Sequence, residues 1–200
     1  MDRLNRLYLA RHGQVVGHDE IMANGHTDVG ITEVGKLQME NLAERLKLTE
    51  LKAIYSSDLK RSVIGARIIS RNHDVPLNSL PEFREICFGE WEGLPLSEIR
   101  KQYPDELYKR QADSVNYHPP GGGENVLSLR KRVMGSLNVI FEEQKGNDIL
   151  LVAHGMVNRV ILCNALGLDL SKAVNIHQKY GCLNIIDYYP GSTLVRLING

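Results

Sequence analysis

The chain has 200 residues, of which 42% are hydrophobic and 24% are charged. Its 24 lysine and arginine residues balance 24 aspartate and glutamate residues, so the formal net charge at pH 7 is zero. This length and composition predict one compact domain over residues 1–200, and the charge balance argues against a nucleic acid or a membrane surface as a partner.

Short apolar runs alternate with amphipathic stretches along the chain, which is typical of a mainly parallel sheet covered by helices. The expected strands are residues 7–10, 53–56, 75–78, 148–153, 183–188 and 193–198. The expected helices are residues 32–48, about 58–70, about 124–144 and about 156–166. Thr32 is the expected N-cap of the first helix, and Gly167 is expected to end the last one. The first helix has apolar residues near the helical period: Val34, Leu37, Leu42, Leu46 and Leu48.

Residues 94–123 do not fit this alternation, because they are rich in tyrosine, proline and charge. Two interpretations stay open, an exposed helical excursion and a cap over a substrate site. This segment contains four aromatic residues, Tyr103, Tyr108, Tyr117 and His118. Their side chains would either stack on an aromatic substrate or pack the segment on the body of the domain.

No apolar run approaches the roughly 18 residues that a membrane-spanning helix needs, and the N-terminal apolar run is too short for a signal peptide. The three cysteines fit neither a disulfide framework nor a paired-cysteine metal site: Cys87, Cys163 and Cys182. We therefore expect reduced thiols and a cytoplasmic location. Cys163 lies in the apolar run VILCNALGL and is expected to fill the core rather than act as a nucleophile.

Two of the expected strands end in the same dipeptide. LYLARHGQ (7–14) leads into His12 and Gly13, and LLVAHGM (150–156) leads into His154 and Gly155. Ligands of open parallel sheets bind outside the carboxyl ends of the strands, so both imidazoles are expected on one rim. A single histidine at such a place is more often structural, but two of them beside Arg11 indicate a site.

Two arginines point to an anion as the ligand. Arg11 offers a planar guanidinium that suits a phosphate or a carboxylate. Arg61 is expected in the first turn of a helix, where free backbone N–H groups and the helix dipole favour an anion; the alternative is a solvated surface residue. Positive charge nearby lowers a histidine pKa and leaves a neutral nucleophile that could take a phosphoryl group.

The leaving oxygen of a phosphate ester also needs an acid that protonates it. The segment PEFREICFGEWEG (81–93) follows the third expected strand and carries four candidates. They are Glu82, Glu85, Glu90 and Glu92. Glu85 alternates with Phe83 and could point into the rim, but the pattern alone does not choose among the four.

Four motifs in order resemble those of the histidine phosphatase superfamily, also called the phosphoglycerate mutase-like family. They are RHG (11–13), SSDLKR (56–61), FREICFGEWEG (83–93) and VAHG (152–155). GHTDVGITEVGKLQ (25–38) also resembles the stretch between the first strand and the first helix of that family. RHG alone is a weak signal, whereas four motifs in order, spanning residues 7 to about 167, are a strong one.

The resemblance implies a three-layer α/β/α sandwich with a mostly parallel six-stranded sheet, one antiparallel strand, and a cap near residues 94–123. It implies His12 as the phosphorylated nucleophile and Glu85 as the proton donor. It implies a phosphate pocket completed by Arg11, Arg61 and His154. Outer phosphate contacts are expected from His18, Asn24 and Gly25. Neither a metal nor a cofactor is implied, and no acidic or histidine-rich ligand cluster stands out in the sequence.

Three positions depart from the pattern of the family. Val15 stands where a threonine or serine is common, His18 where an asparagine often contacts the phosphate, and Gly65 where a threonine is common. These departures concern the outer phosphate contacts, and His18 is expected to compensate as a donor.

The length favours the small phosphatases over the mutases of the family, which are usually longer with a larger insertion over the site. The GHTD segment, the FGEWEG motif and the GGGEN stretch are similar to broad-specificity and α-ribazole phosphatases. We therefore expect a metal-independent phosphomonoesterase of a small phosphorylated metabolite, with α-ribazole 5′-phosphate as the named candidate. The alternatives are a cofactor-dependent phosphoglycerate mutase and a non-catalytic phosphate-binding module. A nucleotide-binding protein is disfavoured, because no GxGxxG or GxxxxGK follows a strand. The oligomeric state is open, and a homodimer is allowed.

Overall fold

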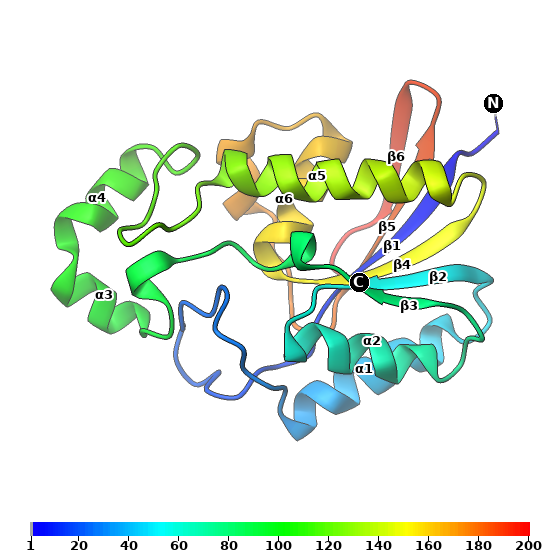
Figure 1. The fold of residues 1–200 in the computed structure, drawn as a ribbon, viewed down its shortest axis with the longest axis horizontal. Coiled ribbons are helices and arrows are strands. Elements are labelled where there is room, and N and C mark those ends of the chain that lie inside the picture. Colours follow the sequence, from blue (N-terminus) through cyan, green and yellow to red (C-terminus); the bar gives the residue numbers. More distant parts are fainter. Residues whose placement is uncertain (1) are drawn as a thin grey trace.

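The computed structural model describes residues 2–200, which form a mixed α/β fold around a six-stranded sheet of order β3-β2-β4-β1-β5-β6 (Figure 1). The strands are β1 (Asn5–Arg11), β2 (Leu51–Ser56), β3 (Leu77–Ser79), β4 (Asp148–Ala153), β5 (Leu183–Tyr189) and β6 (Ser192–Leu197). Strands β1 to β4 pair in parallel, whereas β5 runs antiparallel to its neighbours β1 and β6. The expectation of six strands in a mostly parallel sheet is confirmed.

Helices cover both faces of this sheet (Figure 1). On one face α1 (Glu33–Leu46) and α2 (Lys60–Ser70) pack on Tyr8 and Ala10 of β1. On the other face α5 (Val126–Glu143) and α6 (Gly155–Leu166) pack on Leu7 and Leu9 of the same strand. Successive side chains of a strand point to opposite faces, so one apolar strand such as β1 serves two hydrophobic clusters.

The ends of two helices follow local rules. The Thr32 hydroxyl accepts a hydrogen bond from the Gly35 N–H at 3.0 Å and caps α1 as expected. Gly167 ends α6 with a φ of 65°, a left-handed conformation that glycine adopts without strain. Thr32 thus marks the start of α1, and Gly167 marks the end of α6.

The apolar face expected for α1 is only partly correct. Its buried residues are Gly35, Met39, Leu42, Ala43 and Leu46, whereas three of the residues counted in the periodic pattern are exposed. They are Val34, Leu37 and Leu48. Gly35 and Ala43 belong to the buried face, but such small residues are not recognised by a pattern of large apolar side chains. The pattern therefore placed the apolar face too far toward the exposed Val34 and Leu37.

The segment around residues 94–123 forms two short helices, α3 (Leu96–Gln102) and α4 (Pro104–Ala112), which project beyond the carboxyl ends of the parallel strands (Figure 1). Trp91 is fully buried beneath them. The rings of Tyr117 and Tyr103 lie 5.9 and 6.1 Å from the ring of Trp91, and Tyr108 is exposed. Two of the aromatic residues therefore pack this segment on the body of the domain, which favours the packing interpretation for them.

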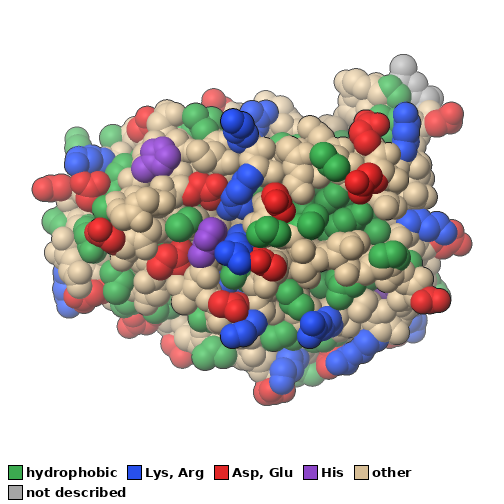
Figure 2. Space-filling model, in the orientation of Figure 1, with side chains coloured by type: hydrophobic (Ala, Val, Ile, Leu, Met, Phe, Trp, Pro, Cys, Tyr) green, Lys and Arg blue, Asp and Glu red, His purple; other side chains and the backbone are tan. Residues whose placement is uncertain are grey.

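The distribution of surface charge and the state of the cysteines agree with the expectations from the sequence. Figure 2 shows basic and acidic side chains interspersed over the face in view. Cys163 is fully buried in α6, where it fills the core as expected, and Cys87 and Cys182 are also free thiols. Across residues 2–200, no helix combines the length and the apolar character that crossing a membrane requires.

Candidate active site

The two His-Gly steps lie side by side at the carboxyl edge of the sheet. β1 and β4 are paired neighbours, with Arg11 opposite Ala153 at their ends, so the residues that follow both strands emerge together. The ring centroids of His12 and His154 are 5.1 Å apart, and the rings are tilted by 60°. Both side chains are buried.

His12 is held as a neutral imidazole with one free nitrogen. Its Nδ1 lies 2.8 Å from the carbonyl oxygen of Gly13, which can only accept, so Nδ1 carries the proton and Nε2 keeps its lone pair. Burial, followed by the positive charges of Arg11 and Arg61, holds the pKa of His12 well below its ordinary value. A buried, unprotonated Nε2 is a nucleophile that does not first have to lose a proton.

His154 has the opposite tautomer. Its Nδ1 accepts a hydrogen bond from Nε of Arg61 at 3.2 Å, which leaves Nε2 to donate to the hydroxyl of Ser57 at 2.6 Å. Burial and the adjacent Arg61 charge lower the pKa of His154 well below its ordinary value. This second imidazole is therefore also neutral, and it couples the ends of β2 and β4.

Arg61 is the second residue of α2, and its side chain is only 1% exposed, which rules out the solvated alternative. Nη1 donates to the carbonyl of Thr27 at 2.7 Å, and Nη2 donates to the carbonyls of Asn24 at 2.9 Å and Gly25 at 2.6 Å. With the bond to His154, four of its five N–H donors are engaged. Asn24 and Gly25 thus use their carbonyls to fix this arginine.

Glu92 holds the loop that carries those carbonyls. One carboxylate oxygen accepts from the N–H groups of His26 and Phe88, both at 2.8 Å, and the other from the N–H and hydroxyl of Thr27 at 2.9 and 2.7 Å. Burial acts to raise the pKa of Glu92, but these four hydrogen bonds outweigh it and hold that pKa below its ordinary value. A Cβ at Gly25 would lie 2.2 Å from the Ile86 carbonyl oxygen, so only glycine fits this turn.

Glu85 differs from the other three glutamates of its segment. Its carboxylate accepts from the N–H of Ile86 at 2.9 Å and from the N–H of Met156, in the first turn of α6, at 3.0 Å. A Cβ at Gly155 would lie 3.6 Å from Oε2 of Glu85 and 3.7 Å from Cζ of Arg11, so the acid and this arginine flank the same glycine. Glu82 and Glu90 are exposed, and the oxygens of Glu92 are occupied as described.

Arg132 of α5 fixes the backbone that carries Glu85. Its five N–H donors make five hydrogen bonds, two to the carboxylate of Glu124 and three to the carbonyls of Glu82, Arg84 and Glu85. The bond to the Glu85 carbonyl measures 2.9 Å. No pattern in the sequence singles out Arg132, because its hydrogen-bond partners lie up to 50 positions away.

Arg11 has a buried donor without a partner among the described residues. Its Nη1 donates to the carbonyl of Gln178 at 2.6 Å, and its Cζ lies 4.1 Å from the centre of the Tyr180 ring. Among the partners that residues 2–200 provide, its buried Nε has none. A buried N–H without an acceptor is costly, and an anion at this point would satisfy it.

The remaining positions singled out in the sequence lie farther out. His18 is in an exposed turn, where its Nε2 lies 3.8 Å from Oδ1 of Asp19. Val15 is buried and bridges to Ile31. A Cβ at Gly65 would lie 2.9 Å from the Met39 side chain, so this glycine serves the contact between α1 and α2.

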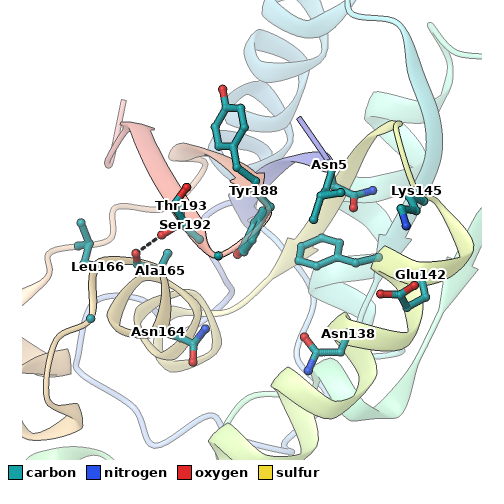
Figure 3. Close-up of a pocket in the computed structure, with 15 residues that line it drawn as sticks. Asn5, Asn138, Glu142, Lys145, Asn164, Ala165, Leu166, Tyr188, Ser192 and Thr193 are labelled. Atoms are coloured by element: carbon teal, nitrogen blue, oxygen red, sulfur yellow. Dashed lines mark hydrogen bonds between the residues drawn. The ribbon is translucent and has the colours of Figure 1, made fainter. Parts of the chain in front are cut away.

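A hollow of about 760 Å³ lies at the end of the sheet opposite the two histidines (Figure 3). It is lined by residues such as Asn5, at the start of β1, and Tyr188, near the end of β5. The candidate site lies at the other edge, and none of its five main residues lines this hollow: Arg11, His12, Arg61, Glu85 and His154. Within residues 2–200, no three His, Cys, Asp or Glu side chains gather as metal ligands would.

Comparison with known proteins connects this geometry to a family. The model of the histidine phosphatase superfamily (branch 1) matches residues 7–200. The chain is 30% identical to phosphoserine phosphatase 1 of Hydrogenobacter thermophilus, over 90% of this chain and 82% of that protein. It is 25% identical to the adenosylcobalamin/α-ribazole phosphatase of Escherichia coli, over 97% and 95%. The structure of Bacillus stearothermophilus YhfR superposes with a TM-score of 0.89 at 27% identity, over 96% of each chain.

Proposed function

Because the chain belongs to branch 1 of the histidine phosphatase superfamily, we propose that it is a metal-independent phosphomonoesterase working through a phosphohistidine on a small phosphorylated metabolite. One observation carries the proposal: the free Nε2 of a neutral, buried His12 lies among two arginine charges. A neutral nucleophile surrounded by fixed positive charge is what attack on an anionic phosphate requires.

In the first step Nε2 of His12 attacks phosphorus and the bond from phosphorus to the ester oxygen breaks. The carboxylic acid of Glu85 gives its proton to that oxygen, so the alcohol leaves neutral. The guanidinium groups of Arg11 and Arg61 stabilise the charge on the equatorial oxygens during transfer. The product of this step is the phosphorylated His12 and a Glu85 carboxylate.

In the second step water attacks the phosphohistidine. The Glu85 carboxylate takes a proton from the water, the bond between phosphorus and Nε2 breaks, and inorganic phosphate leaves. His12 returns to its neutral form and Glu85 to its acid. If a retained sugar-acid hydroxyl took the place of water, the same residues would catalyse a mutase reaction.

Two candidate substrates come from the names of the relatives. α-Ribazole 5′-phosphate follows from the Escherichia coli protein and phosphoserine from the Hydrogenobacter protein. We propose a small phosphate ester as the partner, without nucleic acid or membrane, and a cytoplasmic location in which the three thiols stay reduced. His18 is proposed as an outer phosphate contact that would need its exposed turn to move inward.

The test is hydrolysis of 4-nitrophenyl phosphate between pH 5 and 8 by the wild type, His12→Ala and the control His73→Ala, each with and without excess EDTA. Activity that survives EDTA and His73→Ala but disappears in His12→Ala is expected, together with an acid-labile phosphoryl group on quenched wild-type enzyme. Full activity of a folded His12→Ala variant would overturn the proposal. A 2,3-bisphosphoglycerate-dependent exchange assay in parallel would reveal a mutase.

A further inference from the structure

A cavity of about 490 Å³ lies between the cap and the body of the domain. Its walls are largely apolar and include Phe88, Leu107, Tyr117 and Val174. Two further wall residues, Ile86 and Met156, are those whose N–H groups donate to the carboxylate of Glu85. The wall of the cavity therefore includes two direct neighbours of the proposed proton donor, whose proton goes to the ester oxygen that carries the organic part of the substrate.

Arg110 of α4 lines this cavity and stands without an acidic partner. Its Cζ lies 5.7 Å from the ring centre of Phe88 and 5.8 Å from that of Trp91. Among residues 2–200, no hydrogen bond or ion pair engages its guanidinium. Burial lowers the pKa of Arg110 from its ordinary value, yet an arginine stays charged at neutral pH.

The carboxylates around Arg110 are already occupied. Glu106, one helical turn earlier on α4, pairs with Lys109 at 2.6 Å and accepts from the Tyr117 hydroxyl at 2.8 Å. Glu124 lines the same cavity but accepts two hydrogen bonds from Arg132. The cavity thus holds a guanidinium charge that no side chain neutralises.

A partly buried cation without a counter-ion is unfavourable, and aromatic rings offset only part of that cost. An anionic group in the cavity would supply the missing partner, and its attraction to a guanidinium is stronger there than in water. We propose that this cavity selects phosphate monoesters whose organic part carries a second anionic group, which Arg110 binds. The inference rests on the proposed phosphatase function and names the substrate class of that same site.

The test compares pairs of similar substrates in which only one member carries a second anionic group. One pair is 4-carboxyphenyl phosphate and its methyl ester; a second is 3-phosphoglycerate and glycerol 3-phosphate. A third, propane-1,3-diol bisphosphate and 3-hydroxypropyl phosphate, separates a second phosphate from a carboxylate. For each pair the measured quantity is the ratio of kcat/KM, charged over neutral, in the wild type, Arg110→Met, Arg110→Lys and the matched control Lys109→Met.

We expect Arg110→Met to lower this ratio by about 10-fold or more for at least one pair, as befits the loss of a charge-assisted hydrogen bond. Arg110→Lys should keep part of the preference, and Lys109→Met should keep all of it. Comparing ratios removes differences in leaving-group acidity and any general effect of the substitution. Equal ratios in the wild type and Arg110→Met for all three pairs would overturn the inference.

A binding measurement separates this inference from the phosphatase function itself. Trp91 is the only tryptophan of the chain, so its fluorescence reports on the surroundings of Arg110. The non-hydrolysable 4-(phosphonomethyl)benzoate should bind the wild type about 10-fold more tightly than its methyl carboxylate ester, and Arg110→Met should remove that difference. Hydrolysis that depends on His12 without any such preference would overturn only the substrate class, whereas hydrolysis without His12 would overturn the mechanism.

Discussion

Nε of Arg61 lies 3.2 Å from Nδ1 of His154, although 93 positions separate the two residues. Through this bond the start of α2 is tied to the start of α6. Arg61 also holds three carbonyls of the loop that precedes α1. A single guanidinium therefore fixes the relative positions of three segments around His12.

Arg61→Lys should lower kcat/KM for 4-nitrophenyl phosphate by roughly 100-fold or more, comparable to removing one preorganised oxyanion donor. A lysine has three donors on one atom and cannot replace four hydrogen bonds made by three nitrogens. Arg67→Lys, on an exposed position of the same helix, is the matched control. A loss of kcat/KM below 3-fold in Arg61→Lys would show that catalysis does not depend on the arrangement of the guanidinium N–H groups of Arg61.

Arg132→Met should reduce kcat more than it raises KM, because Arg132 fixes the backbone of the proposed proton donor and has no N–H donor left for a phosphate. We expect a decrease in kcat of about 10- to 100-fold, within the range of a displaced general acid. Arg130→Met on the same helix removes an exposed cation and is the control. The effect should shrink for phosphate esters of acidic phenols, whose leaving oxygen needs no proton; the same loss for all leaving groups would contradict the positioning role.

The local signals in the sequence were sufficient for most of the fold. Apolar runs end where strands end, and β4 begins and ends at the residues expected, because a fully buried parallel strand has an unbroken apolar sequence. The cap on α1 was also predicted, since a capping hydroxyl acts within three residues. The buried face of α1 was not, because Gly35 and Ala43 depend on what packs against them.

The candidate site was predictable only where its residues follow strands. Glu85 could not be chosen over Glu92 by pattern, because the difference lies in partners from distant segments: Met156 for one, and residues 26 and 27 for the other. Arg132 and Arg110 were not predicted from the sequence for the same reason. Their meaning depends on which carboxylates remain free after folding, and that is a property of the tertiary structure.

Glu92→Gln should weaken the loop that holds Arg61. One carboxylate oxygen would become an amide NH₂ facing Thr27. The Thr27 hydroxyl can turn to accept from this NH₂, but the Thr27 backbone N–H would oppose another donor, so its hydrogen bond is lost. We expect the free energy of unfolding to fall by about 1–3 kcal/mol and kcat/KM to fall about 10-fold. Glu90→Gln, exposed in the same motif, is the control. The pKa of Glu92 is lower in the folded protein than in the unfolded chain. The stability that its ionised carboxylate contributes is therefore fully present at pH values above the ordinary pKa of a glutamate, and it is lost as the pH falls from there through the folded-state pKa.

The two central histidines should make the protein less stable in mild acid. Both have folded-state pKa values well below the ordinary value of 6.5, so between those values and 6.5 the unfolded chain binds protons that the folded protein does not. Stability is therefore full above pH 6.5 and declines as the pH falls below it, by up to about 1.4 kcal/mol per pH unit for each histidine. Urea unfolding of the wild type and His12→Gln at pH 7.5 and 5.5 isolates one of the two. The wild type should lose about 1 kcal/mol more than the variant between these pH values. An equal loss would mean that the pKa of His12 is not depressed in the folded protein, so that the imidazole is protonated at pH 5.5 in both states.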